Sequence, residues 1–254
     1  KDMWVRGAPL IGVTASYGMF FALKENSSKK NIEYSFKKLL ATRPTAVDLK
    51  WALENITDVI LQINENDRAD HVWGIARKLE ADSIEQCSKI GNYGLEVIKS
   101  RIKNNKTFNI LTHCNAGWLA CVDWGTALAP IYKAYNSGLD IHVWVDETRP
   151  RSQGAALTAW ELSKHGVPNT LIVDNVGGHL MQRGEVDICI VGSDRTAANG
   201  DVCNKIGTYM KALCAFDNDI PFYVAIPEST IDFKLKSGHN PLTIVITSRS
   251  FFTA

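Results

Sequence analysis

Two residues with chemically useful side chains stand at the ends of apolar, β-branched runs. Cys114 ends the run 108–114, and Asp194 ends the run 186–194. A cysteine at the end of a strand can be exposed and lie near helix amides that favour its thiolate. An aspartate that follows an apolar strand can be partly desolvated, which favours the neutral form that a general acid needs. Both are candidates for proton transfer. The alternatives are a small core residue for the cysteine and a turn or N-cap residue for the aspartate.

His113 directly precedes Cys114, and such a pair could suggest a cysteine hydrolase. Neighbouring residues on a strand point to opposite faces of the sheet, so we do not expect a Cys–His dyad. The sequence contains six cysteines, but no CxxC pair and no Cys/His cluster with the spacing of a zinc site. We therefore expect free thiols in a reducing compartment and no metal.

Three segments place a basic residue and small residues ahead of a predicted helix, which is the pattern of an anion-binding site. One is 192–208, which contains Lys205, and the others begin at Arg6 and Arg43. The glycine patterns of Walker loops and of dinucleotide-binding turns are absent. Each segment alone fits an ordinary surface loop, but the three together predict a phosphorylated small substrate.

The elements that must position these residues change in type near residue 106. Helical periodicity dominates before it, whereas short apolar runs alternate with helix-length segments after it. This alternation predicts an α/β protein whose parallel sheet is covered on both faces, in residues 107–254, after a mainly helical domain in residues 1–106. The predicted helices of the first domain run from Pro9 to about Leu23, 32–40, 45–64 and 70–103. The predicted strands are 108–114, 140–147, 169–175, 186–194 and 221–229, and the helices between them are 119–137, 154–165, 177–184 and 204–218.

Ligands of such a sheet bind beyond the carboxyl ends of its strands. The polar residues at these ends are 113–115, 146–149, 174–175, 192–194 and 227–229. We therefore expect the active site at this edge of the sheet.

Composition and charge exclude several classes of protein. Hydrophobic residues make up 45% of the 254 residues and charged residues 22%, which is typical of globular domains and excludes disorder as the main state. The net charge of +1 provides no field that would attract nucleic acid or an anionic membrane. The most apolar early stretch, 12–23, is too short to span a membrane.

Five segments closely resemble the methylthioribose-1-phosphate isomerase family. This family forms a superfamily with ribose-1,5-bisphosphate isomerase and with the regulatory subunits of the translation-initiation guanine-nucleotide exchange factor. The stretch TAWEL at 158–162 and DRTAANGD at 194–201 are the segments most specific to the isomerase. The resembling segments are RGAPLIG (6–12), RPTAVDL (43–49), THCNAG (112–117), DETRPRSQGAALTAWEL (146–162) and GSDRTAANGDVCNKIGTY (192–209).

The resemblance implies a fold, an assembly and a set of site residues. The fold is a Rossmann-like parallel-sheet domain preceded by a smaller, mainly helical domain. The family is a cytoplasmic homodimer in methionine salvage, with no cofactor or metal and no nucleic-acid or membrane partner. Members carry a longer segment before RGAP, so we expect the first domain to be truncated at its start. The catalytic pair is Asp194 and Cys114, and the substrate contacts are Arg6, Gly7, Ala8, Arg43, Gln153, Asn204 and Lys205.

The implied reaction converts 5-methylthioribose 1-phosphate to 5-methylthioribulose 1-phosphate. Because phosphate blocks the anomeric oxygen, the ring must be opened by protonation of the ring oxygen, a role we assign to Asp194. Cys114 would transfer a second proton or stabilise the transition state. One alternative is an isomerase of another sugar 1-phosphate, such as ribose 1,5-bisphosphate. The other is a non-catalytic regulatory subunit that senses a sugar phosphate.

Overall fold

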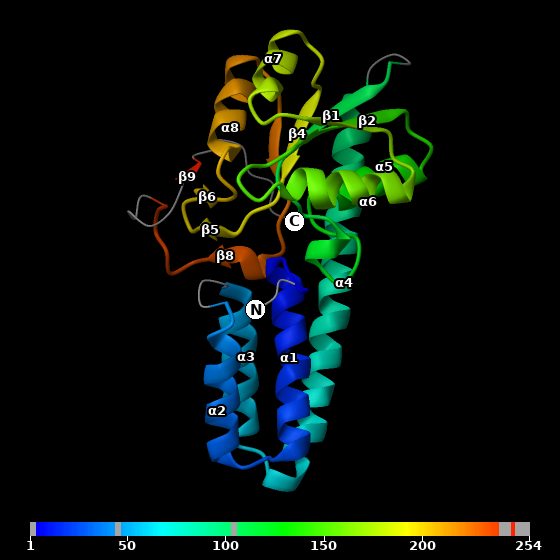
Figure 1. The fold of residues 1–254 in the computed structure, drawn as a ribbon. Helices are drawn as coiled ribbons and strands as arrows, with labels where there is room; N and C mark the ends of the chain where they lie inside the picture. Colours follow the sequence, from blue (N-terminus) through cyan, green and yellow to red (C-terminus); the bar gives the residue numbers. More distant parts are fainter. Residues whose placement is uncertain (1–3, 44–46, 103–105, 239–244, 247–254) are drawn as a thin grey trace. The chain divides into compact units, whose positions relative to one another are not determined.

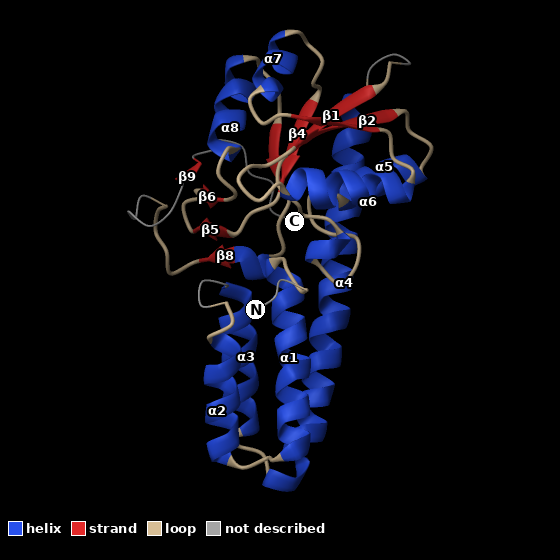
Figure 2. Ribbon diagram, viewed as in Figure 1, coloured by secondary structure: helices blue, strands red, loops and turns tan. Residues whose placement is uncertain are grey.

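The computed structural model describes residues 4–43, 47–102, 106–238 and 245–246, which form two compact units (Figures 1 and 2). The first unit contains the described residues up to Glu85 together with Ala120–Val122. The second contains Gln86–Leu119 and the described residues from Asp123 onward. The division falls inside helix α4 (Arg68–Arg101), earlier than the predicted boundary at residue 106, because the last turns of α4 supply Ile98 to the core of the sheet unit.

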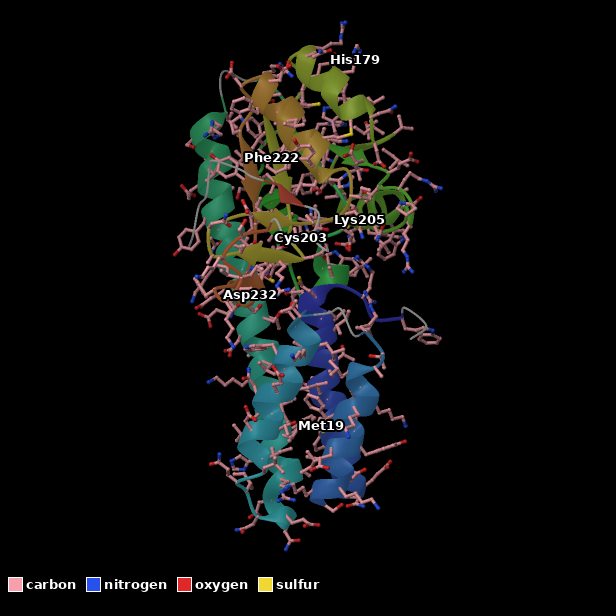
Figure 3. All side chains as sticks on the ribbon, turned by 90° about the vertical axis from the view of Figure 1, so that its left-hand side faces the viewer. Met19, His179, Cys203, Lys205, Phe222 and Asp232 are labelled. Atoms are coloured by element: carbon pink, nitrogen blue, oxygen red, sulfur yellow. The ribbon has the colours of Figure 1, made fainter. Side chains whose placement is uncertain are left out.

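The first unit is helical, as predicted. Helix α3 (Val47–Ile60) buries one face, because apolar residues recur every three or four positions along it. Met19 lies fully buried among the helices of this unit (Figure 3). The hydroxyl of Ser28 caps α2 by accepting the N–H of Asn31. The helices are α1 (Ala8–Glu25), α2 (Lys29–Leu40), α3 (Val47–Ile60) and the first turns of α4, with a short 3-10 turn at Glu65–Asp67.

The second unit is built on a parallel sheet with the strand order β3-β2-β1-β4-β7. All four neighbouring pairs of strands are parallel, which confirms the predicted sheet. Each predicted strand run contains one of these strands. Their bounds are β1 (Phe108–Thr112), β2 (Ile141–Asp146), β3 (Asn169–Ile172), β4 (Ile188–Val191) and β7 (Phe222–Val224).

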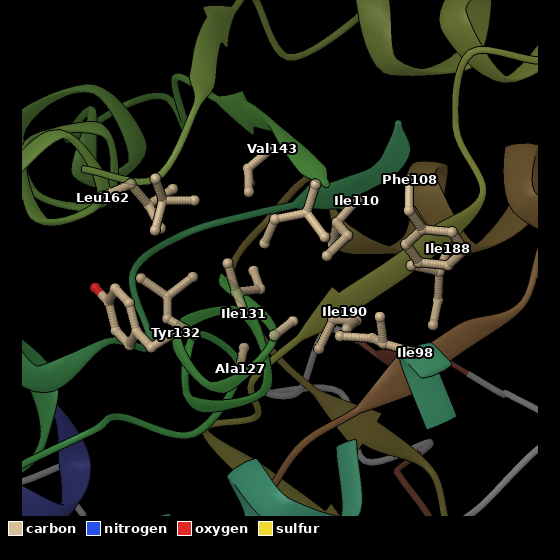
Figure 4. Close-up of a cluster of buried hydrophobic side chains, with 14 of the residues drawn as sticks. Ile98, Phe108, Ile110, Ala127, Ile131, Tyr132, Val143, Leu162, Ile188 and Ile190 are labelled. Atoms are coloured by element: carbon tan, nitrogen blue, oxygen red, sulfur yellow. The ribbon is translucent and has the colours of Figure 1, made fainter. Parts of the chain in front are cut away.

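Helices cover both faces of this sheet. Consecutive residues of β1 serve opposite faces, since Ile110 joins the core with α5 (Ala129–Asn136) and α6 (Ala159–His165). Its neighbour Leu111 joins the core with α7 (Val176–Gln182) and α8 (Thr208–Asp217). Figure 4 shows the first of these cores. A sheet of this kind leaves only its edges and the ends of its strands for chemistry.

A predicted helix over 119–137 is wrong in its first half. A 3-10 turn at Trp118–Ala120 is followed by bends, and α5 begins only at Ala129. The chain reverses there because Trp124 and Gly125 have φ values of 61° and 81°. The N–H of Thr126 then returns to the carbonyl of Ala116. No helix therefore opens directly after Cys114, and helix amides do not account for its environment.

A second, smaller sheet was not predicted. Its order is β8-β5-β6-β9, from β8 (Ile231–Asp232), β5 (Arg195–Ala197), β6 (Val202–Cys203) and β9 (Val245–Ile246). Its strands of two or three residues are too short to show a periodic pattern in the sequence. Within the described ranges, the helices are not both long and apolar enough for any of them to cross a membrane.

Candidate active site

Cys114 follows the carboxyl end of β1 in a strained backbone conformation. Its φ is 70°, in the left-handed region that residues other than glycine rarely adopt. Two threonines hold this conformation, one at each side of the residue. The hydroxyl of Thr148 accepts the N–H of Cys114 at 2.9 Å, and the hydroxyl of Thr158 donates to its carbonyl oxygen at 2.6 Å. Strain of about 1–3 kcal/mol persists only where the surroundings fix it, and such residues cluster at functional sites.

These two hydroxyls belong to a longer chain of hydrogen bonds. Thr148 donates to the carbonyl of Asp146 at 3.0 Å, at the end of β2. On the other side, the amide of Asn115 donates to Thr158 at 3.1 Å and to Glu161 at 2.9 Å. Side chains therefore tie the loop that carries Cys114 to the end of β2 and to α6.

Glu161 anchors the same loop from within the core. One of its oxygens accepts the N–H of Leu119 at 3.1 Å as well as the Asn115 amide, and the other accepts the hydroxyl of Tyr132 at 2.9 Å. The side chain is fully buried, and this burial raises the pKa of Glu161. Thr158 and Glu161 are the first and fourth residues of the TAWEL stretch, so that stretch positions Cys114.

Gln153 lies in the loop that follows β2, immediately before a π-helical turn at Gly154–Thr158. Its Oε1 atom is buried and has no hydrogen-bond partner among the described residues. Asp174 holds the start of this loop by accepting the N–H groups of Thr148 and Arg149, each at 2.7 Å. A buried amide oxygen without a partner is suited to accept a hydroxyl of a bound substrate.

Asn204 and Lys205 lie in the loop before α8, here called the 204–207 loop. The amide of Asn204 donates to the hydroxyl of Thr208 at 3.1 Å, which joins it to the first turn of the helix. Lys205 is half-buried and is labelled in Figure 3. Gly207 has a φ of 101° and forms the N-cap of α8. The loop thus has the small residues, cation and helix start that were predicted for an anion site.

Asp194 lies three residues beyond the end of β4, and its side chain is exposed. Partial desolvation by the preceding strand was predicted, and this expectation is wrong for the chain. The reason is that β4 ends at Val191, and Gly192 and Ser193 carry the chain out of the apolar core. The N–H of Asp194 donates to the carbonyl of Cys203 at 2.8 Å, so Asp194 is attached beside the 204–207 loop.

Both ring nitrogens of His113 bond to groups other than the Cys114 thiol, which agrees with the rejected dyad. Its Nδ1 lies 2.7 Å from Oδ2 of Asp146, and its Nε2 lies 2.8 Å from the carbonyl oxygen of Ile206. His113, Asp146 and Asp174 bring three atoms that could bind a metal within 4.8 Å of one another. Lys211 already pairs with this group, since its Nζ lies 3.1 Å from Oδ2 of Asp146. We therefore interpret the group as a network of charges.

The remaining predicted contacts belong to the helical unit. Gly7, with a φ of 85°, is the N-cap of α1, which begins at Ala8. A Cβ atom at Gly7 would lie 2.3 Å from the backbone of Ala120, so only glycine fits there. Arg6 and Arg43 are half-buried, and Pro44 and Thr45 lie outside the described residues. Convergence of Arg6 and Arg43 with Lys205 stays a prediction.

Residues 4–245 match the family model described as the Initiation factor 2 subunit family. The chain belongs to this family. Its curated relatives in the family include methylthioribose-1-phosphate isomerases. That of Escherichia coli O45:K1 (strain S88) is 55% identical over 94% of the chain and 65% of the relative. That of Paramagnetospirillum magneticum is 56% identical over 96% of the chain and 68% of the relative. The chain thus spans about two thirds of the length of these relatives.

Solved structures of the initiation factor 2 subunit family give the same assignment. The 5-methylthioribose 1-phosphate isomerase of Pyrococcus horikoshii OT3 has a TM-score of 0.83 at 40% identity, over 93% of this chain and 67% of that one. Subunit delta of the translation initiation factor eIF-2B from A. fulgidus has a TM-score of 0.78 at 37% identity, over 97% of this chain and 71% of that one. The predicted resemblance and fold class are confirmed.

Sequence reasoning missed the residues that hold the site of this family member together. Thr148, Thr158 and Glu161 lie within the motifs quoted above but carry no predicted role, and His113 carries none once the dyad is rejected. Threonines in the loops and helix starts that follow strands are a usable signal, because hydroxyls bond readily to nearby backbone groups. Because Thr148 and Thr158 lie far from Cys114 in sequence, no local pattern indicates that they form hydrogen bonds with it.

Proposed function

We propose that the protein is a methylthioribose-1-phosphate isomerase of methionine salvage. It converts 5-methylthioribose 1-phosphate, an aldose derivative, to the ketose 5-methylthioribulose 1-phosphate. The observation that carries this proposal is the 55–56% identity to curated isomerases over 94–96% of the chain. The clamped, strained Cys114 at the carboxyl edge of the sheet supports it, because such strain is typical of a reacting site.

The reaction needs one proton donor, one proton acceptor and a transfer of hydrogen between carbons. Once bound substrate covers its exposed carboxyl, Asp194 gives a proton to the ring oxygen, and the bond from that oxygen to C1 breaks. The hydrogen on C2 then moves to C1, the C2 hydroxyl loses its proton, and C2 becomes the ketone. Asp194 takes up the hydroxyl proton, so that no atoms are gained or lost. If the hydrogen leaves C2 as a proton, Cys114 carries it to C1; if it moves as a hydride, Cys114 stabilises the transition state.

Substrate contacts are proposed for seven residues of the two units. The basic groups bind the phosphate, and the backbone at Gly7 and Ala8 offers amides at the start of α1. The unpartnered oxygen of Gln153 accepts a sugar hydroxyl. The proposed set is Arg6, Gly7, Ala8, Arg43, Gln153, Asn204 and Lys205.

The assembly and cellular setting are proposed on the same basis. We propose a homodimer that works in the cytoplasm on a small phosphorylated sugar, without cofactor, metal, nucleic acid or membrane. All six cysteines are free thiols, which fits a reducing compartment. Size determination of the purified protein by light scattering tests the dimer.

A regulatory role is the second candidate, and the 37% identity to eIF-2B subunit delta of A. fulgidus favours it. Turnover separates the candidates. The purified protein should convert 5-methylthioribose 1-phosphate. It should act on ribose 1,5-bisphosphate at least about 10²-fold less well, because the proposed contacts bind one phosphate and that sugar carries two. Cys114→Ser serves as the control for a contaminating activity. Binding of either sugar phosphate without turnover would favour the regulatory candidate.

A further inference from the structure

Beneath the 204–207 loop lies a buried group of charged side chains that the proposed chemistry does not use. His113 and Asp146 are fully buried, and Lys211 is 3% exposed. They come from three elements, since His113 follows β1, Asp146 ends β2 and Lys211 lies in α8. Asp174, after β3, lies close to the first two. Charges that are buried in this way persist only when they are paired.

The hydrogen bonds of His113 set the number of protons that its ring and the facing carboxylate of Asp146 hold together. The carbonyl oxygen of Ile206 can only accept, so Nε2 of His113 must carry a hydrogen. Nδ1 lies 2.7 Å from a carboxylate oxygen of Asp146, and a hydrogen must lie between these two atoms as well. The pair therefore holds one proton more than a neutral imidazole beside a carboxylate.

Lys211 determines where this extra proton resides. Its Nζ lies 3.1 Å from the same Oδ2 atom of Asp146 that His113 contacts, and it also donates to the carbonyl oxygen of Asp174. Oδ1 of Asp146 has no partner among the described residues, so both cations act on one oxygen. An ammonium group favours an ionised oxygen over a protonated one. The proton therefore belongs to the imidazole.

The count of charges gives the same result independently. The carboxylates of Asp146 and Asp174 lie within 4.8 Å of the ring of His113, and Lys211 provides one cation. The group is neutral only if His113 is charged. The thiol of Cys189 on β4 also faces this group. Burial, with a contribution from Asp146, raises the pKa of this thiol, so that it stays uncharged.

The charged ring also fixes the loop above it. Its Nε2–H holds the carbonyl of Ile206, and its face packs against Gly207, where an added Cβ would lie 2.8 Å from ring atom Cε1. Ile206 is the residue directly after Lys205. We propose that His113 is a positioning residue, which joins the 204–207 loop to Asp146 through both of its ring nitrogens so that Asn204 and Lys205 meet the phosphate. This role in substrate binding rests on the proposed function, whereas the charge and the fixed loop do not.

Nuclear magnetic resonance of ¹⁵N-histidine-labelled full-length protein tests the charge directly. One of the six histidines should carry a hydrogen on both ring nitrogens, as expected when both form hydrogen bonds to acceptors. That signal should be absent in His113→Gln and present in the control His165→Gln, whose residue is exposed. A His113 ring that is neutral at about pH 7.5 overturns the proposal.

Hydrogen exchange and kinetics test the positioning. In His113→Gln, amides of residues 203–208 should exchange about 10-fold faster, and KM should rise about 10-fold with kcat changed less, as expected for one lost charged hydrogen bond. Unchanged exchange in a folded His113→Gln protein overturns the fixed loop. If the wild-type protein turns over no methylthioribose 1-phosphate, the proposed function fails, while the resonance and exchange results still decide this proposal. If His113→Gln does not fold, the wild-type resonance decides it.

Discussion

The hydroxyl of Thr158 donates a hydrogen bond of 2.6 Å to the carbonyl oxygen of Cys114, across 44 residues of sequence. The same hydroxyl accepts from the side chain of Asn115. One oxygen atom therefore fixes both the strained peptide and the residue that follows it. The position of Cys114 therefore depends on a threonine that is distant from it in sequence.

Replacement of Thr158 tests this dependence. Thr158→Val removes the hydroxyl at nearly constant volume and leaves the Cys114 carbonyl without its donor, so stability should fall by about 1–3 kcal/mol. Turnover should fall by at least about 10-fold, because a misplaced reacting group loses much of its rate. Thr158→Ser keeps the hydroxyl and should stay near wild type in both urea unfolding and turnover. If Thr158→Val and Thr158→Ser had the same stability and the same turnover, the hydroxyl would not be what holds Cys114 in place.

The thiol of Cys114 should be the first to react with an alkylating reagent. It is half-exposed, whereas Cys189 is fully buried and burial raises the pKa of that thiol. Mass spectrometry after mild alkylation should show Cys114 modified first, with turnover lost in step, and bound substrate or product should slow the labelling. Cys114→Ser should fold but lose most activity, and Cys214→Ser is the matched control. If protein alkylated at Cys114 turned over substrate normally, the thiol would have a structural role and no role in catalysis.

Asp194 should matter for rate far more than for affinity. Asp194→Asn keeps the size of the side chain and removes its proton transfer, so kcat should fall by at least about 10²-fold. KM should change much less. Asp217→Asn on α8 is a control, because that aspartate is exposed and has no proposed role. Activity of Asp194→Asn within a few-fold of wild type would remove Asp194 from the mechanism.

The three basic residues assigned to the phosphate should act on KM. Arg6→Gln, Arg43→Gln and Lys205→Gln should each raise KM for 5-methylthioribose 1-phosphate by about 10-fold or more, as expected for a lost charged hydrogen bond. Inorganic phosphate should then inhibit each variant more weakly than it inhibits the wild-type enzyme. Arg77→Gln, an exposed arginine beside Glu80, should leave KM unchanged. A variant with unchanged KM would exclude its residue from the phosphate site.

The buried carboxyl of Glu161 should make the stability of the folded protein decline as the pH rises. Burial raises the pKa of Glu161 above its ordinary value of 4.5, so the folded state binds this proton more tightly than the unfolded state. The stability that Glu161 contributes is therefore complete below that ordinary value and declines as the pH rises through the folded-state pKa. Glu161→Gln cannot ionise and can keep its partners, so its free energy of unfolding should decline less over this range than that of wild type.

Glu161→Ala is the contrasting variant. It leaves the donors of Asn115, Leu119 and Tyr132 buried without an acceptor, and stability should fall by about 3 kcal/mol or more. Urea unfolding across the acidic and neutral range measures both variants. An identical pH profile for wild type and Glu161→Gln would show that the carboxyl is not perturbed by its burial.

The sequence predicts the parallel sheet well and the loops poorly, for a physical reason. Apolar runs such as 108–114 identify strands because burial on both faces imposes a local pattern. The start of α5 depends instead on Trp124 and Gly125, whose positive φ values reverse the chain. The small sheet of β5, β6, β8 and β9 is fixed by pairing between distant short segments, which leaves no periodic signal.

The candidate site also has features that a local sequence pattern indicates and features that depend on distant residues. The end of β1 indicates Cys114 as a residue at the ligand edge, because parallel strands share that edge. Its strained φ depends on Thr148 and Thr158, which lie 34 and 44 residues away and follow no spacing rule. The exposure of Asp194 depends on where β4 ends, and strand ends are the least certain part of a sequence-based prediction.

The two threonines that flank Cys114 also provide a criterion for sorting relatives by sequence. The cysteine alone is weak grounds for assigning the same site, because hydroxyls at both 148 and 158 hold the backbone that carries the thiol. A chain with the cysteine but with valine or alanine at either threonine lacks the means to hold the strained peptide. Such a chain should be grouped apart from the isomerases until its turnover is measured, whereas serine at these positions is an acceptable exchange.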